Sequence, residues 1–230
     1  FLPLEASFPE AVAVADRLVY TGYVRAPLGP TPPPGYGDGE VIVSVGGGAV
    51  GDRLLAAAIA ARPLSRESGR TWRLLAGAQP PPALVEAARS TGPGLVLERA
   101  RADFLGLLAR CHVSVSQAGY NTVMDVLTTQ ARTVVVPFAQ GRETEQTQRA
   151  EALARHGWAV VVREDELTPA VLAAAIDRAA AGLLSLIPLS NLPVPVQNYQ
   201  YTTGVPQNAQ NLSVRYGRPI TKKDRLNGNF

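Results

Sequence analysis

Four glycines lie between a short apolar run and a helical pattern in the segment VIVSVGGGAVGDRLL. They are Gly46, Gly47, Gly48 and Gly51. Backbone without side chains can approach a diphosphate closely, and the free N–H groups at a helix N-terminus attract its negative charge. The spacing also satisfies GxGxxG, but a dinucleotide site needs an acid after the next strand, and LLAGAQPPP contains none. We therefore expect either a phosphate-binding turn or a tight turn that binds no ligand.

A second glycine-containing loop occurs in CHVSVSQAGYNTVMDVL. Gly119 ends the loop, and we expect Asp125 in the first turn of the following helix. A carboxylate there can accept hydrogen bonds from the vicinal hydroxyls of a ribose, while the glycine and the helix N-terminus face phosphates. Thr122 and Asp125 also have the spacing of a capping box, which stabilises a helix without any ligand. The residues alone leave both interpretations open.

A third loop leaves an apolar strand in VVVPFAQGRETEQTQRAEAL. Glu145 and Gln146 are adjacent at the start of the predicted helix and point in neighbouring directions. A carboxylate beside an amide suits the hydroxyls of a sugar, each of which donates and accepts hydrogen bonds. An ordinary solvated helix start has the same composition, so this alternative stays open as well.

Short β-branched runs alternate with helical patterns between residues 18 and 182, which predicts repeated βα units. Parallel strands with right-handed helical crossovers form a doubly wound, Rossmann-like α/β sheet that is covered on both faces. Ligands of such sheets bind beyond the carboxyl ends of the strands, here after Val45, Ser116 and Pro137. Ala26–Gly39 is interpreted as a proline- and glycine-rich linker. The predicted strands are Arg17–Tyr20, Val41–Val45, Trp72–Ala76, Leu95–Glu98, Val113–Ser116, Thr133–Pro137 and Ala159–Arg163, and the helices are Asp52–Ala61, Pro82–Ser90, Asp103–Cys111, Thr122–Thr129, Glu143–His156 and Pro169–Ala181.

Composition excludes several classes of protein. A single cysteine, Cys111, rules out an internal disulfide framework and a multi-Cys zinc site, and two histidines without HExxH argue against a His-rich metal centre. No apolar run approaches the roughly 20 residues of a membrane-spanning helix. The net charge of +3 arises in residues 187–230, which hold five basic residues and one acidic residue. The first 186 residues hold seventeen basic and eighteen acidic residues and are therefore almost neutral. This neutral body argues against nucleic-acid binding.

The composition changes abruptly near residue 187. Residues 1–186 contain no lysine and one asparagine, whereas residues 187–230 contain both lysines, six asparagines and four glutamines. We therefore predict a folded domain over 1–186 and an extended, irregular tail of different origin over 187–230. Because the chain begins with Phe1 rather than Met, we also expect it to be a piece of a longer protein with an N-terminal portion missing.

Four blocks, in this order, resemble the C-terminal, donor-binding domain of GT-B glycosyltransferases of the MurG-like family, family 28. They are TGYVR at Thr21–Arg25, VGGGAVGDRLL, QAGYNTVMDVL and VVVPF…EQTQRAEAL. The resemblance implies one half of a GT-B fold that binds a nucleotide-diphosphate sugar, usually UDP-linked (a UDP-hexose or UDP-N-acetylhexosamine). It implies the following site: Gly47, Gly48 and Gly119 near the diphosphate, Asp125 on the ribose, Glu145 and Gln146 on the sugar, Arg25 near the nucleotide, and the Phe104–Leu105 backbone against the base.

Two positions depart from the pattern of this family. Asp125 stands where the family usually has Glu, and Glu145 replaces the first of two glutamines in the best-known members, which leaves the sugar open. No DxD signature appears, and the family stabilises the leaving diphosphate by helix dipoles and hydrogen-bond donors, so the resemblance implies neither a metal ion nor a cofactor.

The resemblance also implies that the acceptor site and the general base lie in an N-terminal domain that this chain lacks. The expected partners are a nucleotide-sugar donor and that acceptor domain; the acceptor is not identified. A cytoplasmic location is implied, with peripheral association with the inner face of the membrane left open. Two alternatives remain: a non-catalytic nucleotide-sugar binding or assembly module, and an enzyme that hydrolyses or epimerises UDP sugars, since a fold does not fix a chemistry.

Overall fold

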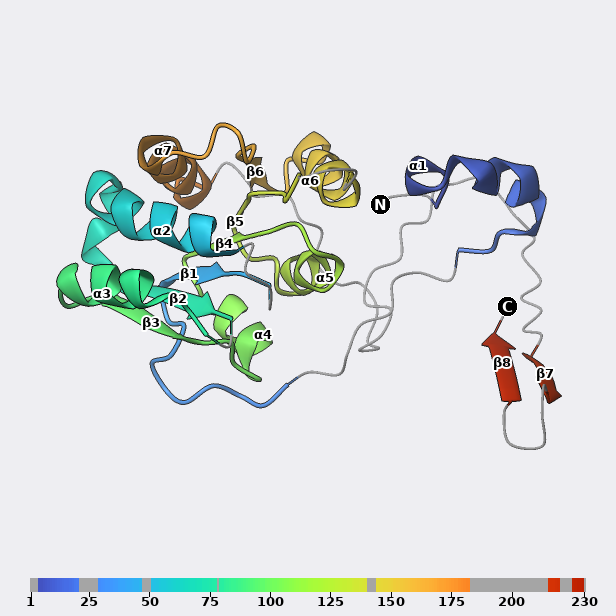
Figure 1. The fold of residues 1–230 in the computed structure, drawn as a ribbon, viewed down its shortest axis with the longest axis horizontal. Helices are drawn as coiled ribbons and strands as arrows, with labels where there is room; N and C mark the ends of the chain where they lie inside the picture. Colours follow the sequence, from blue (N-terminus) through green and yellow to red (C-terminus); the bar gives the residue numbers. More distant parts are fainter. Residues whose placement is uncertain are drawn as a thin grey trace.

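A computed structural model of the 230-residue chain describes residues 4–20, 29–46, 51–77, 79–139, 144–182, 215–219 and 225–229. Its centre is a six-stranded sheet in the order β3-β2-β1-β4-β5-β6, and every pair of neighbours is parallel (Figure 1). This is the predicted doubly wound, Rossmann-like sheet. Its strands are β1 (Val41–Ser44), β2 (Trp72–Ala76), β3 (Leu95–Arg99), β4 (Val113–Ser116), β5 (Thr133–Val135) and β6 (Val160–Val161).

Helices cover both faces of this sheet, because its central strands are apolar on both sides. Val43 of β1 belongs to the core under α2 (Asp52–Ala61), α3 (Pro82–Ser90) and α7 (Pro169–Ala180). Its neighbour Ile42 faces the opposite side and packs with residues of α4 (Phe104–Leu108) and α5 (Tyr120–Thr129). Residues of α6 (Glu145–Arg155) pack with those of α5 in a third cluster on that second face. The body is therefore a three-layer sandwich.

Two short helical segments precede the sheet, and two others follow α2. They are α1 (Leu4–Ser7), the 3₁₀ segment Pro9–Arg17, and the 3₁₀ turns Arg62–Leu64 and Arg66–Gly69. The second pair reaches Trp72, whose indole Nε1 donates a 3.0 Å hydrogen bond to the Glu67 carbonyl. No helix in the described ranges combines the length and the hydropathy that crossing a bilayer requires.

The predicted strand Arg17–Tyr20 is wrong. Pro9–Arg17 forms a 3₁₀ segment, and residues 18–20 belong to no strand. The side chain of Val19 is 78% exposed, so the β-branched run that suggested a strand has no sheet to pack into. At β5 the strand ends at Val135 rather than Pro137: Val136 donates a last hydrogen bond to Ser116, and proline has no N–H with which to continue the ladder.

Residues 29–40 are more than the linker that the sequence suggested; we call them the strap. Pro32 is buried, and a methyl group on Gly106 of α4 would lie only 2.3 Å from its Cδ. Gly37 has a φ of +82°, and a methyl group there would come within 3.0 Å of the Leu107 backbone. Glycine at 37 and 106 thus lets the strap lie directly on α4.

Two strands pair within the C-terminal tail, where the sequence suggested an irregular segment. They are β7 (Arg215–Pro219) and β8 (Arg225–Asn229), antiparallel, with Arg215 opposite Asn229 and Pro219 opposite Arg225. Pro219 occupies the end of its strand, a position where its missing N–H disrupts the ladder least. The domain boundary near residue 187 stays a prediction.

Candidate functional site

The strand order reverses between β1 and β4, and this is where a doubly wound sheet binds its ligand. The loops that follow the two strands meet there: a methyl group placed on Gly46 would lie 3.7 Å from Oε1 of Gln117. The glycine loop ends at Gly51, where a methyl group would come within 2.3 Å of the Val45 side chain, so this position needs glycine for packing alone. The predicted residues Gly47 and Gly48 lie outside the described residues, as does Arg25.

A narrow crevice opens at this edge of the sheet. Its walls come from the first turn of α2, from the loops after β4 and β5, and from the loop after β6. The predicted loops after β4 and β5 therefore meet here with the start of α2, and the loop after β6 joins them. The lining includes Arg53, Leu54, Gln117, Val136, Pro137, Phe138, Glu164 and Leu167.

Hydrogen bonds connect these loops to one another. Nη1 of Arg149 in α6 donates to the Ala118 carbonyl at 3.3 Å, and the same guanidinium forms an ion pair with Glu145. The Phe138 amide donates to Oε1 of Gln146 at 3.2 Å. The Ala139 amide donates to Oε2 of Glu164 at 3.0 Å. The edge is thus held by side chains from α6 and from the loop after β6.

Gly119 is the N-cap residue of α5, as a phosphate-facing glycine should be. Its φ of −62° is available to any residue, and a methyl group there would meet no described atom within 4 Å. Neither backbone conformation nor packing among the described residues explains why this position is glycine. Close approach of a ligand would account for a glycine at this position.

Asp125 lies in the second turn of α5, which corrects the expectation that it lies in the first. The helix begins at Tyr120, two residues before the predicted start, and Gly119 rather than Thr122 is its N-cap. The capping box is therefore not formed. Asp125 is half-buried. It follows Thr122 by three residues and Asn121 by four, so the three side chains share one face of the helix.

The other predicted residues lie on two helix starts. Glu145 and Gln146 occupy the first turn of α6 and have different partners: Glu145 pairs with Arg149, and Gln146 accepts from the Phe138 amide. Phe104 and Leu105 begin α4 and are half-buried. Phe104 packs on the core cluster that α4 shares with α5. Neither pair lines the crevice itself.

Sequence reasoning missed several groups at this edge. Arg53 and Glu164 line the crevice, and Arg149 holds the loop before Gly119. Ligands of such sheets bind at the carboxyl ends of the strands, and the loop after β6 also leaves a carboxyl end. This rule could therefore have pointed to Glu164 from the sequence. Ser116, which ends β4 beside Ser44 of β1, is 1% exposed, and its hydroxyl has no hydrogen-bond partner among the described residues. A bound ligand or water would remove the cost of leaving that group unpaired.

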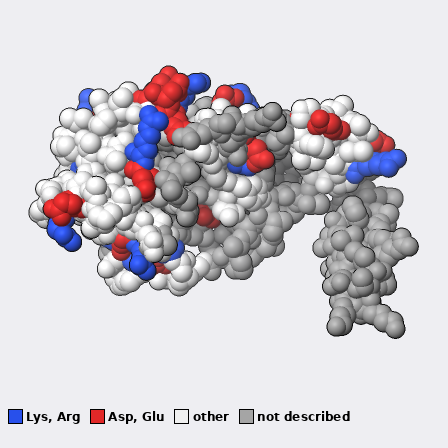
Figure 2. All heavy atoms as spheres, viewed as in Figure 1, with Lys and Arg blue, Asp and Glu red and all other residues white. Residues whose placement is uncertain are grey.

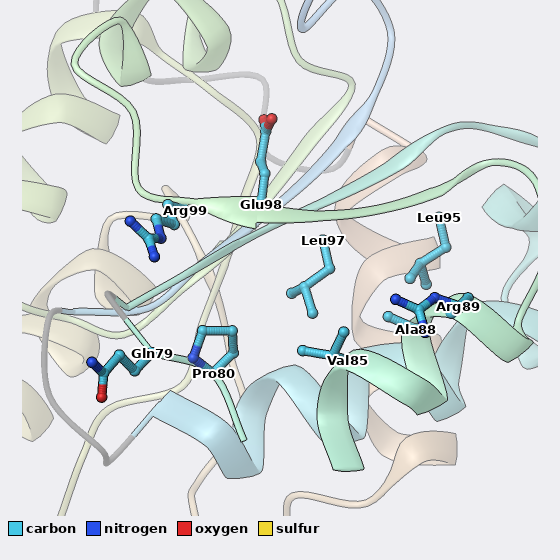
Figure 3. Close-up of a pocket in the computed structure, with 9 residues that line it drawn as sticks. All are labelled: Gln79, Pro80, Val85, Ala88, Arg89, Leu95, Leu97, Glu98 and Arg99. Carbon is cyan, nitrogen blue, oxygen red and sulfur yellow. The ribbon is translucent and has the colours of Figure 1, made fainter. Parts of the chain in front are cut away.

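A larger pocket of about 580 Å³ lies elsewhere, between α3 and the edge strand β3. Figure 3 shows Leu95 and Leu97 pointing from β3 towards Val85 of α3, while Glu98 points to the opposite face of the strand. Size alone would favour this pocket. This pocket lies away from the strand-order reversal, where a doubly wound sheet binds its ligand, so we place the candidate site at the crevice.

The charges and ionisation of the described residues argue against several kinds of site. On the face shown in Figure 2, arginines alternate with Asp and Glu rather than forming the basic stripe of nucleic-acid binders. Burial raises the pKa of the Cys111 thiol to about 12, and its Sγ donates to the Leu108 carbonyl, so it is a structural thiol. Within the described ranges, no three His, Cys, Asp or Glu side chains are grouped as metal ligands.

Comparison with known proteins assigns the family. Residues 83–191 match the glycosyltransferase family 28 C-terminal domain. Two similar curated proteins are UDP-N-acetylglucosamine–N-acetylmuramyl-(pentapeptide) pyrophosphoryl-undecaprenol N-acetylglucosamine transferases. The one from Paramagnetospirillum magneticum is 30% identical over 71% of this chain, and the one from Phenylobacterium zucineum 32% over 72%. The chain spans 47% and 48% of their lengths, about half of each.

Solved structures agree on the fold. Acinetobacter baumannii MurG superposes with a TM-score of 0.50 at 19% identity, covering 64% of this chain and 46% of that one. The calicheamicin glycosyltransferase CalG4 gives 0.51 at 22% identity, covering 69% and 40%. The glycosyltransferase VinC, solved in complex with DTDP, gives 0.52 at 19%, covering 70% and 40%. The sequence matches show that the chain carries a MurG-like glycosyltransferase family 28 C-terminal domain, and the structural likenesses show that its fold is the Rossmann-like half of a GT-B fold.

Proposed function

We propose that this domain binds a nucleotide-diphosphate sugar, UDP-linked, as the donor half of a glycosyltransferase. The observation that carries the proposal is the meeting of the Gly46 and Gln117 loops where the strand order reverses. The N-termini of α2 and α5 both follow these loops, and helix N-termini attract phosphate through free N–H groups and the helix dipole. The similar curated proteins are named for transfer from UDP-N-acetylglucosamine, which supports the choice of donor.

Each group of the donor has a proposed partner. The diphosphate lies between the glycine loop, including Gly47 and Gly48, and Gly119, where the side of the glycine is open. Asp125 accepts from the ribose hydroxyls, and the base lies against the backbone of Phe104 and Leu105. Glu145 and Gln146 contact the sugar, and Arg25 lies near the nucleotide.

We propose that these contacts serve a glycosyl transfer. The acceptor oxygen attacks the anomeric carbon, the bond from that carbon to the diphosphate oxygen breaks, and a base outside this domain takes the acceptor proton. The domain assists by stabilising negative charge on the departing diphosphate with oriented N–H groups rather than with a cation. This domain therefore contributes donor binding and leaving-group stabilisation, and the acceptor and the base belong to another part of the protein.

Calorimetric titration of the chain with UDP tests the proposal. Asp125→Ala removes a charged hydrogen-bond acceptor and should weaken binding about 10- to 100-fold. Asp165→Ala is the matched control, because Asp165 is an exposed acid in the loop before α7, outside the crevice lining. Equal affinities of the parent and Asp125→Ala would remove the ribose role. Absence of UDP binding by the parent chain would contradict the proposed function itself.

A further inference from the structure

A buried charge network lies on the α4 side of the sheet, at its β3 edge. The Arg73 side chain, 8% exposed, donates two 2.7 Å hydrogen bonds to the Glu40 carboxylate and one of 2.9 Å to Glu98. Glu40 ends the strap, Arg73 lies in β2 and Glu98 lies in β3. The network thus joins the residue before β1 to the neighbouring strands β2 and β3.

A second arginine extends this network to the start of α4. Arg101 donates to both oxygens of Asp103, at 2.8 and 2.6 Å, and lies 3.5 Å from Glu98. Asp103 is the N-cap residue of α4 and directly precedes Phe104. Its carbonyl accepts from the Gly106 and Leu107 amides at 2.9 and 3.2 Å. The position of Asp103 therefore sets the first turn of α4.

The strap contacts both arginines through a single aromatic ring. The guanidinium carbons of Arg73 and Arg101 lie 4.6 and 4.9 Å from the centroid of the Tyr36 ring. A methyl group on Gly29, at the other end of the strap, would lie 2.4 Å from the Ala102 carbonyl oxygen. The strap therefore touches residues 101–103 at two separate points.

We propose that Arg101, held by Tyr36 and Glu98, is a positioning residue that fixes the Phe104–Leu105 backbone and thereby sets which nucleotide base the domain accepts. The inference rests on the proposed function, because that backbone segment is the proposed contact of the base. Arg101 acts through Asp103 and does not itself touch the nucleotide.

Two physical arguments favour positioning over simple stabilisation. A five-residue helix such as α4 cannot hold its own first turn in water, so its geometry must come from outside it. Buried ion pairs contribute little net stability compared with apolar packing, whereas they can fix a single arrangement of the groups they join. The pKa of Asp103 is held below its ordinary value chiefly by the hydrogen bond from Arg101, so the pair stays ionised at neutral pH.

The test compares the affinities of the full chain for UDP, CDP, dTDP, ADP, GDP and inorganic pyrophosphate. Arg101→Gln should reduce the ratio between the best and the poorest nucleotide about fivefold or more, while pyrophosphate binding stays within a factor of about two. Arg101→Lys keeps the charge but loses the two-point geometry, and should fall between Arg101→Gln and the parent. Tyr36→Leu, which removes only a partly exposed ring, should reduce the ratio in the same direction.

The control is Arg163→Gln. Arg163 has the same Arg-x-Asp spacing with Asp165, at 3.1 Å, but both side chains are at least 65% exposed and they lie before α7. Arg163→Gln should leave the ratio between the best and the poorest nucleotide unchanged, and pyrophosphate binding as well. A base preference that survives in Arg101→Gln and Tyr36→Leu overturns this inference alone, and so does an equal loss of affinity for every ligand, pyrophosphate included. A parent chain that binds no nucleotide overturns it together with the proposed function.

Discussion

The guanidinium of Arg149 donates a 3.3 Å hydrogen bond to the Ala118 carbonyl and pairs with Glu145 one helical turn earlier. This side chain, which is 15% exposed, joins α6 to the loop before Gly119. The proposed sugar contact and the proposed diphosphate contact therefore share one structural support.

Arg149→Met should loosen both contacts. We expect affinity for UDP-N-acetylglucosamine to fall about tenfold, and affinity for UDP to fall less, because only the sugar contact depends on Glu145 directly. Calorimetry with the two ligands measures the difference. Arg155→Met, at the exposed end of the same helix, is the control. An equal loss for both ligands would show that Arg149 supports the diphosphate loop only.

Alanine should lower the stability of the fold more at Gly51 than at Gly119. At Gly51 a methyl group would come within 2.3 Å of the Val45 side chain, so we expect Gly51→Ala to lower the free energy of unfolding by about 1–3 kcal/mol. A methyl group on Gly119 would meet no described atom within 4 Å, so Gly119→Ala should lower the free energy of unfolding by less than about 1 kcal/mol. Urea unfolding measures both.

The same two variants separate folding from binding. Gly119→Ala should weaken UDP binding about tenfold or more, since its methyl group would occupy the space proposed for the diphosphate. An unchanged affinity in a folded Gly119→Ala protein would place the phosphates elsewhere.

His112 should make the fold sensitive to mild acid. Burial, and then the nearby positive charge of Arg70, lower the pKa of its imidazole below the ordinary value, although Nε2 lies 3.2 Å from a Glu67 carboxylate oxygen. The folded chain then binds the proton more weakly than the unfolded chain, so stability decreases as pH falls through about 6.5, the ordinary pKa of histidine, towards the lowered one.

His112→Gln should flatten this dependence. Urea unfolding of the parent and of His112→Gln between pH 8 and pH 5 measures the difference. A parent whose stability rises as the pH falls through this range would contradict the assigned sign.

Local patterns predicted the body of the sheet well. The helices Asp52–Ala61 and Pro82–Ser90 and the strand Val113–Ser116 have the predicted bounds, because strong helical or β-branched patterns between glycines and prolines coincide with burial in the core. The meeting of the loops after β4 and β5 with the start of α2 followed from the same patterns, through a topological rule that needs only the order of strands and helices.

Long-range contacts could not be predicted in this way. The sequence of the strap is rich in proline and glycine, which is typical of a linker. Nothing near Tyr36 in the sequence indicates that its ring will contact Arg73 and Arg101. The hydrogen bond from Ala139 to Glu164 spans 25 residues. The start of α5 was misplaced because Thr122 resembles a cap, whereas the loop geometry at Gly119 determines where the helix begins.

The arrangement of β1 and β4 bears on how a ligand would enter. The two strands are paired from Val41 with Val113 to Ser44 with Ser116, and the helices that follow them pack on opposite faces of the sheet. Separating β1 from β4 would break main-chain hydrogen bonds of this ladder. The floor of the proposed donor site is thus made of paired strands. We therefore expect little conformational entropy to be lost there on association, and adjustment to different sugars to fall to the loops above it.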